Sequence, residues 1–204
     1  MTSVRVVHLV DDDAAVRSSI GGLLRLGGFI VREYPSGRAL LDRVAALEDG
    51  CILLDLRMPE LSGLEVQAEL ARLGIDLPVI FLTAHGDVPT GVSAMKRGAS
   101  DFLQKPVRES VLREALLQGF ERLDAMSERR AAARHARQLL ATMTPREREV
   151  IGLVASGLRN RDIATRLDIS LQTVKVHRMR AMAKLQAETM LELSRVWADA
   201  NAEP

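Results

Sequence analysis

Hydrophobic residues in the first 120 positions alternate between two periodicities. Short apolar runs are typical of buried strands, and they occur at Val4–Val10, Phe29–Tyr34, Cys51–Leu54, Pro78–Leu82 and Asp101–Leu103. Between them the spacing becomes that of amphipathic helices, at Ala14–Leu26, Gly37–Leu47, Leu64–Leu73 and Val88–Arg97, with a further helix beginning near Glu109. Strands that alternate with helices of this length predict an α/β fold with a parallel sheet covered on both faces.

The pattern changes after residue 120. Residues 121–143 contain neither Gly nor Pro and are rich in Ala, Arg and Glu, which favours a helical linker. The rest of the chain is helical in pattern. We expect one helix from the capping box at Thr144 to about Gly157, then helices at about Arg161–Leu167, Leu171–Leu185 and from Glu188. The predicted organisation is an α/β domain at 1–122, a linker at 123–141 and an all-α domain of four helices at 142–204.

Composition narrows the class of protein. The chain has 204 residues, of which 47% are hydrophobic and 27% charged, as in ordinary globular proteins. A single cysteine, Cys51, excludes an internal disulfide framework and a zinc site built from several cysteines. No apolar run approaches the length of a membrane span and no signal peptide precedes the first strand, so we expect a cytoplasmic protein without a membrane partner.

The net charge of +1 conceals an asymmetry. Residues 1–120 contain 13 basic and 16 acidic side chains, whereas residues 139–204 contain 10 basic and 8 acidic. An acidic first part and a mildly basic last part are compatible with a nucleic-acid partner at the C-terminal end, although the imbalance is too small to require one.

Charged and polar side chains follow several of the predicted strands. These residues are Asp11 and Asp12 after the first strand, Asp55 after the third, Thr83 after the fourth and Lys105 after the fifth. The carboxyl ends of parallel strands share one edge of the sheet, where ligands bind. Clustered carboxylates raise one another's pKa, and a hard cation such as Mg²⁺ relieves their repulsion.

This cluster suggests a definite chemistry. A carboxylate that faces Mg²⁺ and a lysine can act as a nucleophile toward phosphorus and form an aspartyl phosphate. Asp55 is the candidate acceptor, and Asp11 and Asp12 are the candidate metal pair. Asp13 is more simply the N-cap of the helix that begins at Ala14.

The same residues allow three other interpretations. The acids could be unrelated loop residues, which would leave their coincidence at strand ends unexplained. A Mg²⁺-dependent phosphohydrolase with an aspartyl-phosphate intermediate would also need a general acid or base and a substrate pocket, and neither is evident. A Rossmann-type nucleotide-binding protein is disfavoured because no G-x-G-x-x-G motif follows the first strand.

The segment "SLQTVKVHRMRAMAKL" raises a second functional question. On a helical wheel one apolar stripe comprises Leu171, Val174, Ala181, Met182 and Leu185. The opposite side carries Gln172, Lys175, Val176, Met179 and Ala183, flanked by Thr173, Arg180 and Lys184. Residues 171–184 include four Lys or Arg, one His and no acid. A short helix, a tight turn and this basic helix fit a reader of the DNA major groove, and a solvated charged face is the alternative.

The motifs "VDDD", "DLRMPELSG", "FLTAHGD" and "DFLQKP" resemble the signature of two-component receiver domains, over roughly residues 1–122. The resemblance implies a flavodoxin-like (βα)5 fold. It also implies Mg²⁺ bound directly by Asp12 and Asp55, through water by Asp11, and by the backbone carbonyl of Arg57. A sensor histidine kinase would donate the phosphoryl group to Asp55, and Thr83 and Lys105 would contact it. The Lys105–Pro106 peptide bond would be cis.

The same resemblance implies a conformational switch. Thr83 would move toward the phosphoryl group, and the aromatic ring of Phe102 would turn inward. Many receivers carry Tyr at this position, and Phe lacks its hydroxyl group. Plain core packing is the alternative role for Phe102.

The segment from "MTPREREVIGLVASG" to "RMRAMAKL" resembles the helix-turn-helix of the LuxR/FixJ type, across about residues 142–200. By position, Lys175 and Val176 would meet base edges, and Met179 would occupy a base-reading position beside Arg180. Thr173, His177 and Lys184 would contact the DNA backbone or stabilise the docking. Leu191, Val196 and Trp197 of the last helix would either form a dimer interface or close a small core.

Together these resemblances predict a response regulator of the FixJ/NarL type, which acts as a transcription regulator and not as an enzyme. Phosphorylation at Asp55 would favour a homodimer that binds double-stranded promoter DNA, with RNA polymerase as a further candidate partner. In the unphosphorylated state the receiver would restrain the DNA-binding domain, by direct contact or through the linker. A regulator that binds DNA without phosphorylation is the alternative, and the complete acidic set argues against it.

Overall fold

A computed structural model describes residues 5–84, 91, 94–96 and 98–202 of the chain. The chain divides into two compact units, residues 1–125 and 126–204. Among the described residues, no helix is both long enough and apolar enough to cross a bilayer.

The first unit is built on a parallel sheet of five strands. The strands are β1 (Val6–Val10), β2 (Ile30–Tyr34), β3 (Gly50–Asp55), β4 (Val79–Thr83) and β5 (Asp101–Gln104). Their spatial order is β2-β1-β3-β4-β5, and every neighbouring pair is parallel. This is the flavodoxin-like order of doubly wound sheets, which confirms the predicted fold class.

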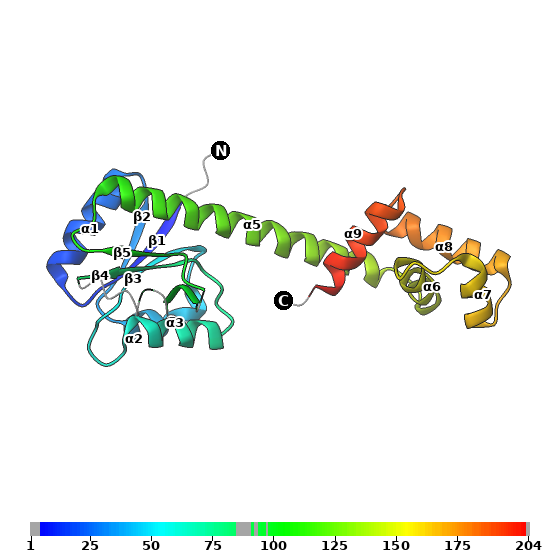
Figure 1. Cartoon of the computed structure of the whole chain (residues 1–204), viewed down its shortest axis with the longest axis horizontal. Helices are drawn as coiled ribbons and strands as arrows, with labels where there is room; N and C mark the ends of the chain where they lie inside the picture. Colours follow the sequence, from blue (N-terminus) through cyan, green and yellow to red (C-terminus); the bar gives the residue numbers. More distant parts are fainter. Residues whose placement is uncertain (1–4, 85–90, 92–93, 97, 203–204) are drawn as a thin grey trace. The chain divides into compact units, whose positions relative to one another are not determined.

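Helices cover both faces of the sheet (Figure 1). Helices α1 (Ala14–Leu26) and α5 (Glu109–Ala141) lie against one face, and α2 (Gly37–Leu41) and α3 (Gly63–Arg72) against the other. Each face of the sheet has its own hydrophobic core, and successive residues of a central strand point into opposite cores. In β3, for example, Leu53 packs with α1 and α5, whereas Leu54 packs with α2 and α3. Because both faces are buried, β3 and β4 are apolar over most of their length rather than alternating, and β1 is apolar except for the buried His8.

The observed elements differ from the predicted ones in one instructive place. The helix expected at Gly37–Leu47 ends at Leu41 and is followed by a separate 3₁₀ turn, Val44–Ala46. The prediction was too long because Val44 and Leu47, which follow the break, also pack on the core and continue the apolar spacing of the helix. Of the helix expected at Val88–Arg97, residues 91 and 94–96 are helical, and the remaining positions lie outside the described residues.

The predicted linker is not a separate element. Helix α5 runs without interruption from the first unit to Ala141. Its first turns carry Leu112, Leu116 and Phe120, which are buried against the sheet. The following Ala, Arg and Glu residues prolong the helix because they have high helix propensity and no glycine or proline intervenes.

The second unit contains four further helices around a small core. They are α6 (Pro145–Ala155), α7 (Asn160–Leu167), α8 (Leu171–Lys184) and α9 (Met190–Asn201). The predicted capping box at Thr144 and Glu147 is present, with Pro145 in the first turn of α6. The fully buried residues Ile151, Ile163, Val174 and Leu193 bring one side chain from each helix into the core.

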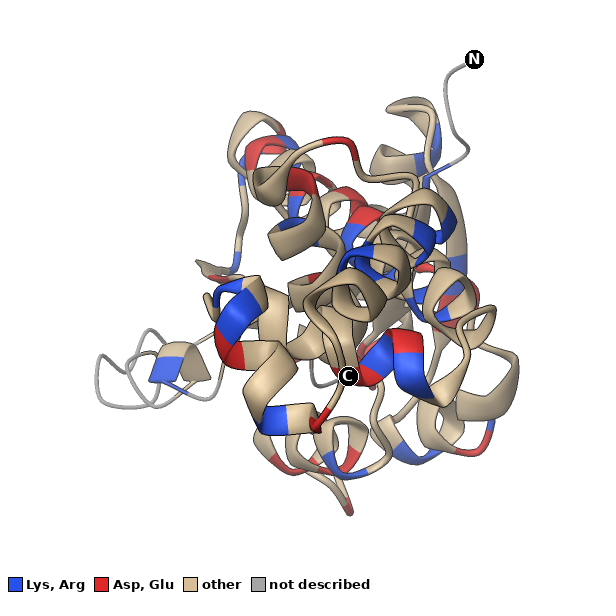
Figure 2. Cartoon of the chain, turned by 90° about the vertical axis from the view of Figure 1, so that its right-hand side faces the viewer, with Lys and Arg blue, Asp and Glu red and all other residues tan. Residues whose placement is uncertain are grey.

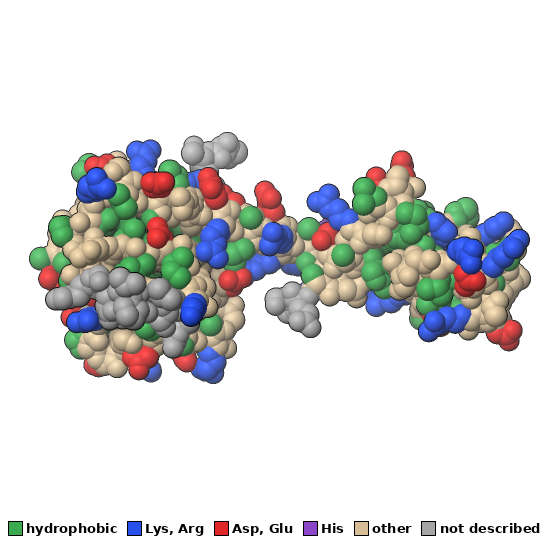
Figure 3. All heavy atoms as spheres, viewed as in Figure 1, with side chains coloured by type: hydrophobic (Ala, Val, Ile, Leu, Met, Phe, Trp, Pro, Cys, Tyr) green, Lys and Arg blue, Asp and Glu red, His purple; other side chains and the backbone are tan. Residues whose placement is uncertain are grey.

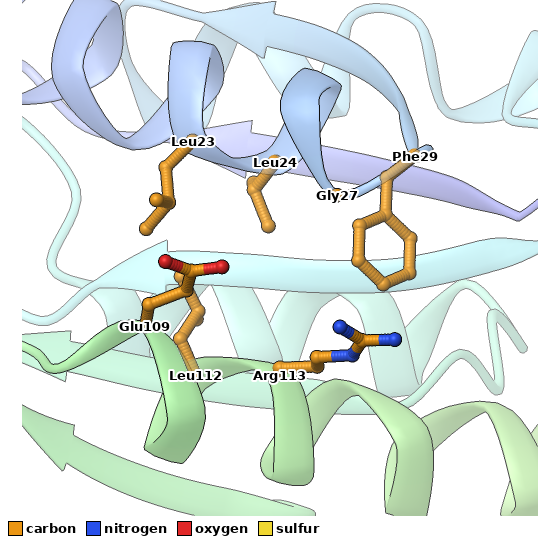
Figure 4. A pocket seen from close by; sticks show the side chains of 7 residues that line it. All are labelled: Leu23, Leu24, Gly27, Phe29, Glu109, Leu112 and Arg113. Carbon is orange, nitrogen blue, oxygen red and sulfur yellow. The ribbon is translucent and has the colours of Figure 1, made fainter.

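A small hollow between the end of α1 and the start of α5 is shown in Figure 4. Leu23, Leu24, Phe29 and Leu112 line it, together with the charged pair Glu109 and Arg113. Its volume of about 20 Å³ is room for about one water molecule. It is therefore a packing defect rather than a ligand site.

Candidate functional site

Two buried carboxylates share one ammonium group at the edge of the sheet where the strands end. Asp11 directly follows β1, and Asp55 is the last residue of β3; their side chains are 1% and 8% exposed. Lys105 Nζ, contributed by the segment after β5, donates hydrogen bonds to Asp11 Oδ2 and Asp55 Oδ1, each at 2.5 Å. The convergence expected for these three side chains is confirmed.

Backbone groups hold both carboxylates in place. The Arg57 amide donates to Asp55 Oδ2 at 2.9 Å, and the Asp13 amide donates to Asp11 Oδ1 at 3.0 Å. Each carboxylate therefore meets the lysine with one oxygen and a neighbouring amide with the other. The Lys105–Pro106 peptide bond is cis, as expected.

The start of α3 approaches Asp55 closely. A Cβ atom at Gly63 would lie 2.5 Å from the carbonyl oxygen of Asp55 and 2.9 Å from the Phe81 ring. No side chain fits at such distances without a shift of the backbone. Only glycine lets α3 begin directly beneath the strand end that carries the carboxylate.

Burial and pairing act in opposite directions on these charges. Burial raises the pKa of Asp55, although the hydrogen bond and charge of Lys105 counteract it. Burial lowers the pKa of Lys105, but the hydrogen bonds and charges of Asp11 and Asp55 outweigh that effect and raise it overall. The ammonium therefore stays protonated, while the carboxylate is more basic than an exposed aspartate.

The remaining acids of the β1–α1 segment have different surroundings. Asp12 is exposed, whereas Asp13 caps α1 by accepting hydrogen bonds from the amides of Ala15 and Val16. Arg17 donates through one guanidinium nitrogen to the backbone carbonyls of Asp11 at 2.7 Å and Asp12 at 3.0 Å. The cap at Asp13 was predicted. The contact of Arg17 was not, because no local pattern marks a side chain that reaches back to a preceding loop.

Thr83 and Phe102 lie on neighbouring strands. Thr83 is the last residue of β4 and is buried. Its backbone carbonyl oxygen accepts a hydrogen bond of 2.7 Å from the backbone amide of Lys105. The Phe102 ring is half-buried and lies 6.5 Å from the Phe81 ring between centroids, at a tilt of 47°. This packing agrees with the plain core role of Phe102, and its part in a switch stays a prediction.

The donor set at the strand ends is one that suits Mg²⁺. Within the part of the chain that the structure describes, no group of three or more His, Cys, Asp or Glu side chains is arranged to hold a metal ion. Mg²⁺, however, is commonly bound by one or two carboxylates with water molecules completing its shell. Asp11 and Asp55 supply two such carboxylates, and the single charge of Lys105 balances only one of them.

A shallow groove opens beside Lys105. It has a volume of about 550 Å³ and is lined mainly by apolar side chains of α1, including Val16, Ile20 and Leu23, and by Pro106 and Val107. Lys105 can therefore be reached from the solvent through a groove whose walls are largely apolar.

The second unit carries a helix-turn-helix. Helix α7 ends at Leu167, the next residue, Asp168, has a left-handed backbone with φ of 52°, and α8 begins two residues after Ile169. Ser170 caps α8 by accepting the Thr173 amide at 3.0 Å. One face of α8 buries Val174 and Ala181, and the side chains of Lys175, Met179 and Arg180 are exposed.

Comparison with known proteins identifies both units. Residues 7–117 match the family model of the response regulator receiver domain, and residues 141–197 match that of bacterial regulatory proteins of the luxR family. The chain belongs to the FixJ/NarL family of two-component response regulators. It is thus a receiver joined to a helix-turn-helix DNA-binding domain that regulates transcription.

Relatives match this response regulator over nearly the whole chain. The transcriptional regulatory protein FixJ of Rhizobium meliloti (strain 1021) is 42% identical over 93% of this chain and 93% of its own length. The tetrathionate response regulatory protein TtrR of Salmonella typhimurium (strain LT2) is 44% identical over 93% of this chain and 90% of its own.

Solved structures agree. The response regulator StyR aligns with a TM-score of 0.79 at 38% identity, covering 96% of this chain and 98% of that one. Full-length FixJ from B. japonicum aligns over the whole of both chains with a TM-score of 0.61 at 35% identity.

The residues of this response regulator that are expected to contact DNA differ in how far their side chains are exposed. Lys175, Met179 and Arg180 are exposed, and Thr173, Val176 and His177 are half-buried. Lys184 differs, since its Nζ donates to Glu147 Oε2 at 2.6 Å and to the Thr142 carbonyl at 3.1 Å. Lys184 therefore connects the end of α8 to the start of α6. Glu147 was recognised only as a cap, because its second partner lies 37 residues away.

Two further polar side chains of α8 are turned toward the domain. Arg178 donates to Asn160 Oδ1 at 3.0 Å, which connects α8 to the first turn of α7. His177 Nδ1 is buried and has no hydrogen-bond partner within the described structure. The imidazole is thus anchored by packing on that side.

The residues expected at a dimer interface also divide. Val196 and Trp197 pack against the core of the second unit, and the Trp197 ring lies over Gly152. Leu191 is 81% exposed. The packing of Val196 and Trp197 agrees with the alternative in which α9 closes a small core, and the part of all three residues in a dimer stays a prediction.

Proposed function

We propose that this response regulator accepts a phosphoryl group on Asp55 from a sensor histidine kinase and, in that state, binds promoter DNA as a homodimer. The observation that supports the first step is the shared contact of Lys105 with Asp11 and Asp55 at the strand ends. It places a nucleophilic carboxylate, a second acid and a fixed cation within one small site.

The residues of this site have separate roles in the proposed transfer. The Asp55 carboxylate attacks phosphorus, and the bond from phosphorus to the donor's leaving group breaks. Lys105 leaves its pairing with Asp55 and holds a phosphoryl oxygen, and the Thr83 hydroxyl contacts another.

Asp11, Asp12, Asp55 and the backbone carbonyl of Arg57 would hold Mg²⁺. When bound, Mg²⁺ supplies the positive charge that offsets the negative charge of the phosphoryl oxygens. The oxygen-only donor set and the incompletely balanced carboxylates support this assignment.

Phosphorylation is tested with the full chain, acetyl phosphate and Mg²⁺. Intact-mass measurement should show one added phosphoryl group on the wild type and none on Asp55→Asn. Omitting Mg²⁺ should abolish the gain. Modification of both proteins, or of neither, would remove Asp55 from this role.

The proposed output is DNA binding by α8. Lys175, Val176 and Met179 would meet base edges. Thr173, His177 and Arg180 would contact the backbone or support docking, and Lys184 would support docking through Glu147. Leu191, with Val196 and Trp197, would contribute to the dimer, and RNA polymerase is a further candidate partner at the promoter. Phosphodonor treatment should therefore raise both dimer content and operator affinity of the wild type, and neither in Asp55→Asn.

We further propose that residues 1–122 act as the receiver, 123–141 as the linker and 142–204 as the DNA-binding domain, with Phe102 contributing to the switch. Helix α5 includes all of this linker, up to Ala141. If it restrains the DNA-binding domain, deleting one helical turn within 126–134 should alter the effect of phosphorylation on DNA binding. An unchanged effect would eliminate this route.

A further inference from the structure

Helix α8 carries an exposed apolar side chain on a face that includes basic residues and no acid. Met179 is 64% exposed. It lies one helical turn from Lys175 and beside Arg180, which are also exposed, and follows the half-buried Val176 by three residues. No acid occurs from residue 171 to residue 187. Figure 3 shows Lys and Arg side chains gathered near the α7 and α8 end of this unit, with hydrophobic atoms among them.

Packing within the domain does not account for Met179. The core side of α8 is formed by Val174, Ala181 and Leu185, and Met182 packs beside them. Neither Met179 nor Val176 belongs to that core. Side chains three or four residues apart lie on the same side of a helix. Val176 and Met179 are therefore neighbours on one side of α8, where Val176 is half-buried and Met179 is exposed.

The charge around this pair indicates its occupant. A helix face with lysine and arginine but no acid is complementary to the phosphates of DNA, and the second helix of a helix-turn-helix lies in the major groove. In the cartoon of Figure 2, positions of Lys and Arg and positions of Asp and Glu are interspersed along much of the chain. The stretch from residue 171 to residue 187, in contrast, contains no acid. DNA is the occupant to which the luxR-family match also points.

The major groove offers one apolar group to such a side chain. Its base edges present hydrogen-bond donors and acceptors, and the C5-methyl group of thymine is the exception. We infer that Met179, supported by Val176, reads the C5-methyl group of a thymine in the operator. The thioether has no hydrogen-bond donor with which to favour guanine or adenine, and its flexible chain lets it close on a methyl group.

This inference rests on the proposed docking of α8 in the major groove, and it adds to that proposal the identity of one base that the helix recognises.

The test of this inference begins with selection of binding sites from randomised duplex DNA by the full chain, with acetyl phosphate and Mg²⁺ present. Each selected thymine is then replaced by uracil. This exchange removes only the C5-methyl group and leaves the hydrogen-bonding pattern unchanged.

For the wild type, one thymine in each half-site should show a loss of affinity of about three- to tenfold on replacement by uracil, the scale of one buried methyl group. Met179→Ala should bind the thymine and uracil duplexes equally, and Met179→Leu should keep the preference. Met95→Leu, a change at an exposed methionine of the first unit, should behave as the wild type.

The outcomes separate the two levels of the argument. If the wild type selects no DNA sequence, the proposed function fails together with this inference. If it selects a site but no uracil replacement weakens binding, or if Met179→Ala retains the loss, the assignment of Met179 is wrong while the DNA-binding function stands.

Discussion

The ammonium of Lys184 lies 2.6 Å from a carboxylate oxygen of Glu147, and this contact joins the end of α8 to the first turn of α6. Glu147 is 3% exposed and also completes the capping box with Thr144. The hydrogen bond of Lys184 and the amide of Thr144 hold the pKa of Glu147 at about 2, well below the ordinary value of 4.5. One carboxylate therefore serves both the helix start and the position of the DNA-binding helix.

The sign of the resulting pH dependence follows from this shift. Because the pKa of Glu147 is lower in the folded chain, its stabilising effect is complete above about pH 4.5 and is lost as the pH falls toward about 2. We expect Glu147→Gln, which can still serve in a capping box, to lower the free energy of unfolding near neutral pH by about 1–3 kcal/mol. It should also flatten the pH dependence across that acidic range.

The only tryptophan of the chain, Trp197, lies in the same unit, so its fluorescence during denaturant unfolding measures this stability directly. Glu149→Gln is the matched control, because Glu149 forms an exposed pair with Arg146 and should change stability by less than about 1 kcal/mol. Equal effects of the two substitutions would show that the contact of Lys184 with Glu147 contributes no more to stability than an exposed ion pair.

Gly63 should tolerate no side chain. Gly63→Ala would place its Cβ against the Asp55 carbonyl and the Phe81 ring, and we expect a loss of about 1–3 kcal/mol in the unfolding free energy of the receiver. Gly22→Ala, within α1 and with no atom within 4 Å of its added Cβ, should instead stabilise by about 0.5–1 kcal/mol. Chemical unfolding followed by circular dichroism measures both. A stable Gly63→Ala variant with normal phosphorylation would contradict the close approach.

The single cysteine should be chemically silent in the folded protein. Burial raises the pKa of the Cys51 thiol to about 12, and the thiolate is the reactive form. A disulfide reagent at mildly alkaline pH should therefore modify Cys51 only as the receiver unfolds. Labelling followed by mass measurement across a denaturant series tests this, with urea-unfolded protein as the positive control. Rapid labelling without denaturant would show that the sheet around Cys51 opens readily.

Arg17 should support the metal site through the loop that carries it. Its guanidinium holds the carbonyls of Asp11 and Asp12 together, and we expect Arg17→Lys to lower Mg²⁺ affinity about tenfold, as is common for groups that orient metal ligands. Titration calorimetry of the unphosphorylated chain measures this without reference to activity.

The sign of the effect distinguishes two physical causes. If Arg17 mattered only as a repelling positive charge, Arg17→Lys would have no effect and Arg17→Gln would bind Mg²⁺ more tightly. Arg25→Gln is the control on the same helix, because Arg25 pairs with Glu33 at the surface and should leave the titration unchanged.

Local pattern explains why much of this protein was predictable. The alternation of apolar runs with amphipathic helices marked the strands, and acids directly after Val10 and Leu54 marked the ligand edge, because strand ends in a parallel sheet necessarily converge. The capping residues Asp13 and Thr144 were equally local, since a cap and its amide partners lie within three residues of each other.

Contacts between distant segments were decided only by the tertiary structure. The pairing of Lys184 with Glu147, the reach of Arg17 to the preceding loop and the space that excludes a side chain at Gly63 all join groups whose approach depends on how elements pack. Side-chain type and helical period place a residue on a face, as they placed Met179. Whether that face meets the core or remains exposed is determined by the neighbouring helices, and so Trp197 packs inward while Met179 stays exposed.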